Sequence, residues 1–191
     1  MDNSFLITAF YFFSYVADGI FSGIKIVVPL VLLLKIFKAN TRNPDLDILI
    51  NSLNILLLTG SLLFLISMLI NFYRVTIADD PMERDFMMAL ATGQNWYQMA
   101  IPSIVYAILP NLLWFNKLRK TIYSSGLIVL CWFITFYAVE YFSYRNDDYI
   151  FKHARPIKIP VEITSEKSIV FILLLLVIYM VIHYKRKKNN S

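Results

Sequence analysis

The sequence predicts an all-α integral membrane protein with five transmembrane helices, the first four of them packed as a four-helix bundle. Of its 191 residues, 58% are hydrophobic and 16% are charged. A soluble domain has close to half apolar and about a quarter charged residues. Apolar stretches of roughly 20 residues, enough to cross a bilayer, recur along the chain. Aromatic residues make up 16% of the chain, which is typical of lipid contact and interfacial belts.

The first apolar stretch ends at Phe37 and begins somewhere between Phe5 and Gly19. Residues 5–37 are too many for one straight crossing of the hydrocarbon core. Either the helix projects beyond the membrane, or residues 5–15 lie in the interface. No positive residue precedes the apolar run and no small-residue cleavage site follows it, so a cleaved signal peptide is not expected.

Four further stretches have the length and apolar composition of membrane spans. They are expected at residues 46–72, 96–115, 123–142 and 169–184. The chain then divides into a four-helix membrane bundle (1–143), an outer loop (144–167) and a fifth transmembrane helix with a basic tail (168–191).

The Lys and Arg residues between the spans predict the orientation. Ten of them lie in short segments on the side of the C-terminal tail, and seven lie in two longer loops on the other side. The positive-inside rule therefore places the C-terminus in the cytoplasm and the N-terminus outside. We expect a multi-pass protein of the bacterial inner membrane, whose tail Lys185–Lys188 anchors the topology and does not bind nucleic acid.

Ionisable side chains inside the spans are the most informative functional feature. Asp18 and Lys25 lie in the first stretch, and Glu140 lies near the end of the fourth. Each costs several kcal/mol at bilayer depth, so such residues usually mark proton, ion or ligand sites. At about 1.5 Å per residue, Asp18 is roughly 25 Å from Lys35 and Glu140 roughly 30 Å from Lys120. Both acids therefore approach the outer boundary, which predicts an outward-facing polar pocket.

A structural interpretation of the same residues stays open. Glu140 would then only pair with Arg145 at the interface, and Asp18 would cap a helix start before Gly19. Lys25 is deeper than Asp18 on roughly the same helix face. It must pair, extend to the interface or lose its proton. Asp18, Glu140 and Lys25 are thus candidates for handling protons or a quinone, without a certain catalytic role.

Several other site chemistries are not expected. The single cysteine, Cys131, lies in a span, which argues against a disulfide, an iron–sulfur cluster or a zinc site. The two histidines, His153 and His183, do not face each other at bilayer depth as haem ligation requires. No metal site, no intrinsic cofactor and no soluble-enzyme motif is predicted. Gly19 and Gly23 form a G-x-x-x-G pattern, which favours close helix packing.

Three strings in order resemble the C-terminal half of NrfD-like membrane subunits, over roughly residues 10–143. The first is Tyr15-Val-Ala-Asp-Gly-Ile-Phe-Ser-Gly23. The second is Leu58-Thr-Gly60, in a span that closes on Asn71-Phe-Tyr-Arg74 and an acidic loop at 80–83. The third is Leu109-Pro-Asn-Leu-Leu-Trp-Phe-Asn-Lys-Leu-Arg119. The family includes the polysulfide reductase anchor and the quinol-interacting subunits of alternative complex III.

The resemblance implies the quinone side of a respiratory electron-transfer complex. Glu140 matches a family Glu near the outer end of the corresponding helix, but Tyr141 stands where the family has Arg. The family half that holds most of the quinone pocket is missing from this chain. A quinone or quinol is therefore expected at a site shared with partner subunits. Asp18 and Glu140 would accept protons or bind a quinol hydroxyl, with Arg74, Tyr141, Tyr73 and Asn71 as binding residues nearby.

Three functions follow, in decreasing order of support. The first is a subunit of a quinone-linked respiratory complex, accessory or proton-handling, with membrane partners and outer-face iron–sulfur or haem subunits. As an enzyme it is at most a subunit without a redox centre in a quinol:acceptor oxidoreductase. The second is a structural or assembly subunit without chemistry. The third is a small ion or proton transporter, for which the sequence offers few polar residues in the cytoplasmic half and no inverted repeat.

Overall fold

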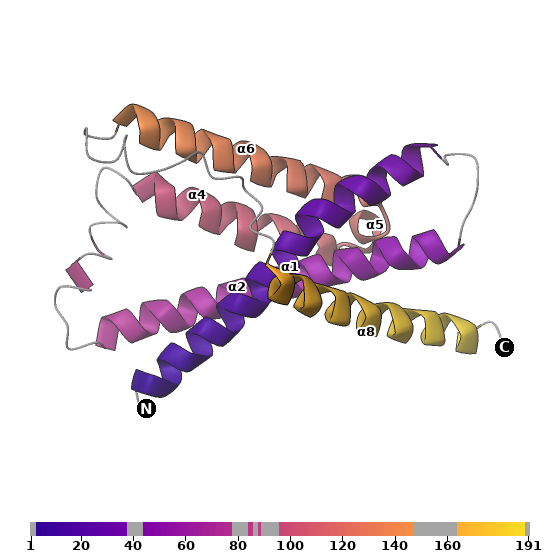
Figure 1. The fold of residues 1–191 in the computed structure, drawn as a ribbon, viewed down its shortest axis with the longest axis horizontal. Helices are drawn as coiled ribbons and strands as arrows, with labels where there is room; N and C mark the ends of the chain where they lie inside the picture. Colours follow the sequence, from indigo (N-terminus) through magenta and orange to yellow (C-terminus); the bar gives the residue numbers. More distant parts are fainter. Residues whose placement is uncertain are drawn as a thin grey trace.

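The structure is a computed structural model that describes residues 3–37, 44–77, 84–85, 88, 96–146 and 164–189 (Figure 1). Its elements are α1 (Asn3–Phe37), α2 (Pro44–Ile77), α4 (Trp96–Ala107), η1 (Leu109–Trp114), α5 (Asn116–Arg119), α6 (Ile122–Asn146) and α8 (Ser165–Asn189). The described part of the chain contains no strand. Four helices, α1, α2, α6 and α8, are long and apolar enough to cross a membrane. The prediction of an all-α membrane protein is confirmed.

The span expected at 96–115 is divided, so the described residues hold four long apolar helices where five were predicted. Helix α4 has 12 residues, and the 3-10 helix η1 follows it. Pro110 has no N–H to donate to the carbonyl one turn earlier, which disfavours a continuous helix. The carbonyl oxygen of Ala107 instead accepts from Ser61 Oγ at 2.7 Å and from Asn111 Nδ2 at 2.5 Å. These two side chains thus provide hydrogen bonds to a backbone carbonyl that has no donor from its own helix at the break.

Helix α1 is one continuous helix of 35 residues, about 52 Å long at 1.5 Å per residue. It contains Pro29 without a break. It runs antiparallel to α2 and is inclined to the neighbouring helices (Figure 1). Close approach of α1 and α2 depends on Gly60, because a methyl group there would lie 2.8 Å from Ile20 and 3.0 Å from Phe21. The alternative in which Asp18 caps a helix start before Gly19 is wrong, because α1 is continuous through both residues.

Lys35 and Arg186, from two of the basic segments predicted to lie on one side of the membrane, both contact the first turn of α2 at one end of the bundle. Lys35 Nζ lies 3.6 Å from Asp47 Oδ1. From α8, Arg186 Nη1 donates to the carbonyl oxygen of Pro44 at 3.0 Å. Helix α1 begins at one end of the bundle, and α8 ends at the other (Figure 1). The placement of the termini on opposite sides of a membrane stays a prediction.

The core lies where α1, α2 and α6 meet. Ile20, Ile24, Leu53, Leu57 and Trp132 are all less than 2% exposed. Many large apolar side chains on the outer faces of the helices are exposed, as expected where lipid is the solvent.

Helix α8 packs on the outside of α1 and α2. Only 6% of the residues in its most apolar stretch are buried against the rest of the protein. Helix α8 is therefore peripheral. It begins at Ser165, and therefore Glu166 and Lys167, expected in the outer loop, form its first turn. Thr164 caps this turn by accepting the N–H of Lys167 on Oγ1 at 3.3 Å. The helix begins beside the middle of α1, so α1 and α2 continue well past its N-terminus (Figure 1).

Candidate functional site

A cavity of about 900 Å³ lies along the N-terminal half of α1. Helix α8 stops short of this half, and its first turn supplies Lys167 at the cavity edge. The volume is at the upper end of the range for ligand sites, roughly 300–1,000 Å³. Its described lining is mostly apolar and aromatic: Ile7, Thr8, Tyr11, Phe12, Ser14, Tyr15, Asp18, Phe21, Lys25, Phe64, Tyr106 and Lys167.

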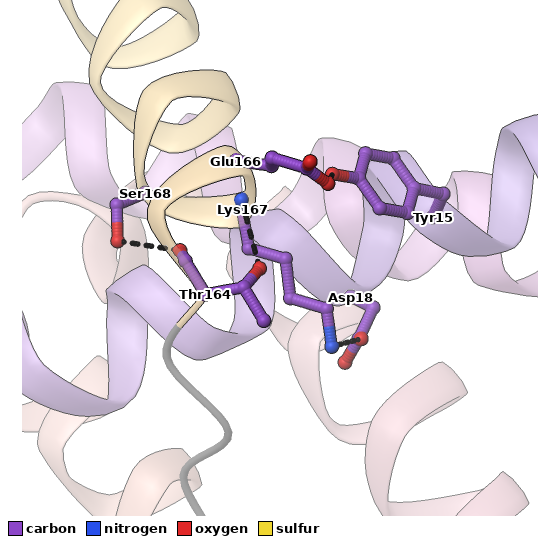
Figure 2. Close-up of polar contacts among 6 residues, drawn as sticks. All are labelled: Tyr15, Asp18, Thr164, Glu166, Lys167 and Ser168. Atoms are coloured by element: carbon purple, nitrogen blue, oxygen red, sulfur yellow. Dashed lines mark hydrogen bonds and ion pairs between the residues drawn. The ribbon is translucent and has the colours of Figure 1, made fainter.

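Asp18 forms an ion pair with Lys167 across the α1–α8 interface (Figure 2). The distance from Lys167 Nζ to Asp18 Oδ2 is 2.5 Å, and the side chains are 14% and 53% exposed, respectively. One turn away, the Tyr15 hydroxyl donates to Glu166 Oε2 at 3.0 Å. Two polar contacts, one ion pair and one hydrogen bond, thus hold the first turn of α8 to α1.

The glycines predicted to form a close-packing face receive α8. A methyl group at Gly19 would lie 3.3 Å from the carbonyl oxygen of Lys167. A methyl group at Gly23 would overlap the ring of Phe171. Because both positions lack a side chain, the backbone of α8 approaches α1 closely enough for Lys167 to reach Asp18. The predicted role of the G-x-x-x-G pattern is confirmed.

Lys25 lines the inner end of the cavity among aromatic rings. Its Nζ is 5.2 Å from the ring centroid of Tyr106 and 6.0 Å from that of Trp132. These two rings stack with centroids 4.8 Å apart and planes 18° apart. Phe21 meets Trp132 edge to face at 5.0 Å. Contact with aromatic faces stabilises an ammonium group in a desolvated position, so these rings offset part of the cost of burying the Lys25 charge.

The structure brings Asp18 and Lys25 to one cavity, as expected for candidate site residues. The partner of Asp18 is Lys167, which sequence reasoning missed because it assigned that residue to a loop. The only signal for it was the charged pair Glu166–Lys167 directly before an apolar run. Glu140 and Tyr141 belong to α6, but their side chains lie outside the described residues. The predicted convergence of Asp18 and Glu140 therefore stays a prediction.

The other expected binding residues lie in the last turns of α2. Arg74 donates to Asn71 Oδ1 from Nε at 3.4 Å and from Nη2 at 3.1 Å. Tyr73 is 49% exposed. None of the three is among the described residues that line the cavity.

The site combines a large apolar surface with a few charged groups. The described residues contain no group of three or more His, Cys, Asp or Glu side chains that could hold a metal ion. What the arrangement can do is bind a flat apolar molecule and offer it ammonium donors and a carboxylate. No protein-family model matches the chain, and neither does any curated protein or solved structure.

Proposed function

We propose that this protein is an integral membrane subunit of a quinone-linked respiratory electron-transfer complex, with NrfD-like character. The observation that carries the proposal is the cavity in which Asp18 and Lys25 lie together among aromatic side chains. Ligand sites typically have this character, with an apolar wall and a small number of polar groups that orient the ligand.

The residues present fit a quinone. Tyr106 and Phe21 offer aromatic faces and edges against which a flat ring can pack. The ammonium groups of Lys25 and Lys167 are donors suited to carbonyl oxygens, and the carboxylate of Asp18 can accept from a quinol hydroxyl. A bound quinone would supply the two-electron carrier chemistry, and the side chains would bind and orient it and hold protons.

The proposal requires partner subunits. Electrons would pass to iron–sulfur or haem groups of proteins on the outer face, and this chain would form part of the membrane anchor beneath them. We place the basic end of the bundle, with Lys35 and Arg186, in the bacterial cytoplasm. The cavity then opens in the outer half of the inner membrane.

The test is a gentle-detergent purification of the tagged protein from its native membranes. Visible absorption of haem or iron–sulfur groups with stoichiometric partners is the expected result. In that complex, Lys25→Met should lower quinol oxidation, because it removes the charge and keeps most of the volume. Lys117→Met is the matched control, since Lys117 is exposed at the other end of the bundle. A colourless protein without partners would contradict the proposal.

A structural or assembly subunit is the second candidate, favoured by the ion pair between Asp18 and Lys167. This pair and the Gly23–Phe171 contact fasten α8 to the bundle. Under this alternative, Asp18→Ala lowers the yield of assembled complex and leaves turnover per complex unchanged. A fall in turnover at normal yield would exclude it.

A further inference from the structure

We propose that a groove between the beginning of α2 and the end of α8 binds the phosphate group of an anionic phospholipid. The groove lies at the end of the bundle opposite to the start of α1 (Figure 1), and its volume is about 550 Å³. The described residues that line it are Pro44, Asp45, Ile48, His183, Arg186 and Lys187. It shares no described lining residue with the Asp18 cavity, and the inference does not depend on the proposed function.

Both helices change between polar and apolar residues at this groove. Helix α8 is apolar over residues 169–182, and the basic residues 185–188 follow shortly after. Helix α2 begins with the polar segment Pro44-Asp-Leu-Asp47, and its apolar run follows. Because Arg186 Nη1 donates to the carbonyl oxygen of Pro44 at 3.0 Å, the two changes lie at the same level. In a membrane this is the level of the lipid headgroups.

The charges at the groove favour a phosphate. Arg186 and Lys187 are both exposed and bring two formal positive charges, against one negative charge from Asp45. The next acid on α2, Asp47, lies 3.6 Å from the ammonium group of Lys35, which offsets its charge. Guanidinium and ammonium groups form charge-assisted hydrogen bonds with phosphate oxygens. Basic side chains at the headgroup level also attract anionic lipids.

Apolar surface beside these charges favours a lipid over a free phosphate ion. Ile48, which is 4% exposed, gives the groove an apolar wall. A second depression on α8 shares His183 and Lys187 with the groove and is also lined by Met180 and Tyr184, which are 59% and 71% exposed. An acyl chain can therefore lie along α8 while the phosphate stays beside the basic side chains.

A zwitterionic phospholipid is the alternative, because the carboxylate of Asp45 could accept from an ethanolamine ammonium group. The two lipids predict opposite effects of Asp45→Asn. Loss of this negative charge should favour an anionic headgroup, whereas it should weaken the binding of a headgroup that carries an ammonium group.

The experiment is native mass spectrometry of the full chain, purified in a mild detergent and titrated with three lipids that carry the same palmitoyl and oleoyl chains. They are phosphatidylglycerol, phosphatidylethanolamine and phosphatidylcholine. Lys187→Gln removes one charge from the groove and leaves the hydrogen bond between Arg186 and Pro44 in place. Lys185→Gln is the matched control, because it removes the same charge from the same end of α8 at a residue outside the described lining.

We expect the first molecule of phosphatidylglycerol to bind about tenfold or more tightly than phosphatidylcholine, since two basic side chains line the groove. Lys187→Gln should weaken this binding about fivefold, as for one basic side chain near an anionic lipid. Lys185→Gln should change it less than about twofold, because it lies outside the groove. Asp45→Asn should strengthen the binding of phosphatidylglycerol.

Equal weakening by Lys187→Gln and Lys185→Gln would overturn the groove, since it would show only a diffuse attraction to the basic tail. Tighter binding of phosphatidylethanolamine than of phosphatidylglycerol, with a loss in Asp45→Asn, would overturn the choice of an anionic lipid. Glycerol phosphate bound as tightly as phosphatidylglycerol would overturn the lipid as the source of the phosphate. Equal binding of all three lipids would reject the site. The purified chain is tested without partners, so none of these results depends on whether a respiratory complex is recovered.

Discussion

At the scale of residues, the contact between Asp18 Oδ2 and Lys167 Nζ at 2.5 Å joins two charges in a largely apolar setting. A second pair, Lys35 with Asp47, provides a comparison within the same chain. That pair is 3.6 Å apart, with side chains 31% and 49% exposed. The first pair is shorter and its lysine is only 14% exposed, so less water screens it.

Double-mutant cycles should give a larger coupling free energy for the Asp18–Lys167 pair than for the Lys35–Asp47 pair. Using Asp18→Asn with Lys167→Met, we expect a coupling free energy of about 1–2 kcal/mol, above the usual value for exposed pairs of roughly 0–1 kcal/mol. The cycle of Lys35→Met with Asp47→Asn should give less than about 0.5 kcal/mol. The measurement is reversible unfolding in mixed detergent and SDS micelles. Equal couplings at the two pairs would show that burial of Lys167 adds nothing.

Sequence reasoning identified Asp18 and Lys25 from the cost of charge in an apolar stretch, and this signal is local. Their partners are not local. Tyr15 and Glu166 are 151 residues apart in the chain, and no spacing rule links them. The aromatic contacts of Lys25 come from α4 and α6, whose relative rotation depends on packing. The types of the site residues were therefore predictable, whereas their pairing was not.

At the scale of helices, one methyl group added at Gly23 should weaken the packing of α8 against α1 and lower the free energy of unfolding. Gly23→Ala places that group against the ring of Phe171, and overpacking of this kind costs about 1–3 kcal/mol. Phe171→Leu should recover part of the loss in the double variant. Gly126→Ala is the control, because its methyl group would meet only the end of the flexible Leu32 side chain.

The same micelle unfolding measurement compares the four variants. If Gly126→Ala were as destabilising as Gly23→Ala, the loss would reflect a general effect of the substitution and not the contact with α8.

The break between α4 and η1 gives a second prediction at this scale. Asn111→Leu removes the donor to the Ala107 carbonyl and to Ser61 Oγ, and we expect a loss of about 1 kcal/mol in unfolding free energy. Asn116→Leu removes only an exposed contact with Arg119 and should cost less than about 0.5 kcal/mol. Hydrogen exchange should rise near residues 107–111 in the first variant. Unchanged exchange there would contradict this role for Asn111.

The apolar pattern of residues 96–115 predicted one span, because composition indicates how long an apolar stretch is. It does not indicate whether the helix through that stretch is continuous. Pro110 was visible in the sequence, but prolines also occur in unbroken helices, as Pro29 does in α1. What distinguishes the two is the availability of side-chain partners such as Ser61 on a neighbouring helix. That information exists only in the packed structure.

At the scale of the whole molecule, the chain alternates direction through the bundle, and its ends lie apart (Figure 1). We expect a fluorescent protein at the C-terminus to be active in the cytoplasm and a phosphatase at the N-terminus to be active outside. The physical reason is the collection of basic residues at the end that contains Lys35 and Arg186. Activity of only one of the two reporters would place both termini on the same side and show that the segment of α4 and η1 does not cross the membrane.

The peripheral position of α8 has a consequence for how the protein is made. Ribosomes synthesise α1 before α8, so Asp18 is made before its partner Lys167. During that interval a carboxylate at bilayer depth lacks this compensation, and the groove at Gly19 and Gly23 has not yet received α8. Docking of the last helix would therefore finish the cavity and relieve this cost in one event.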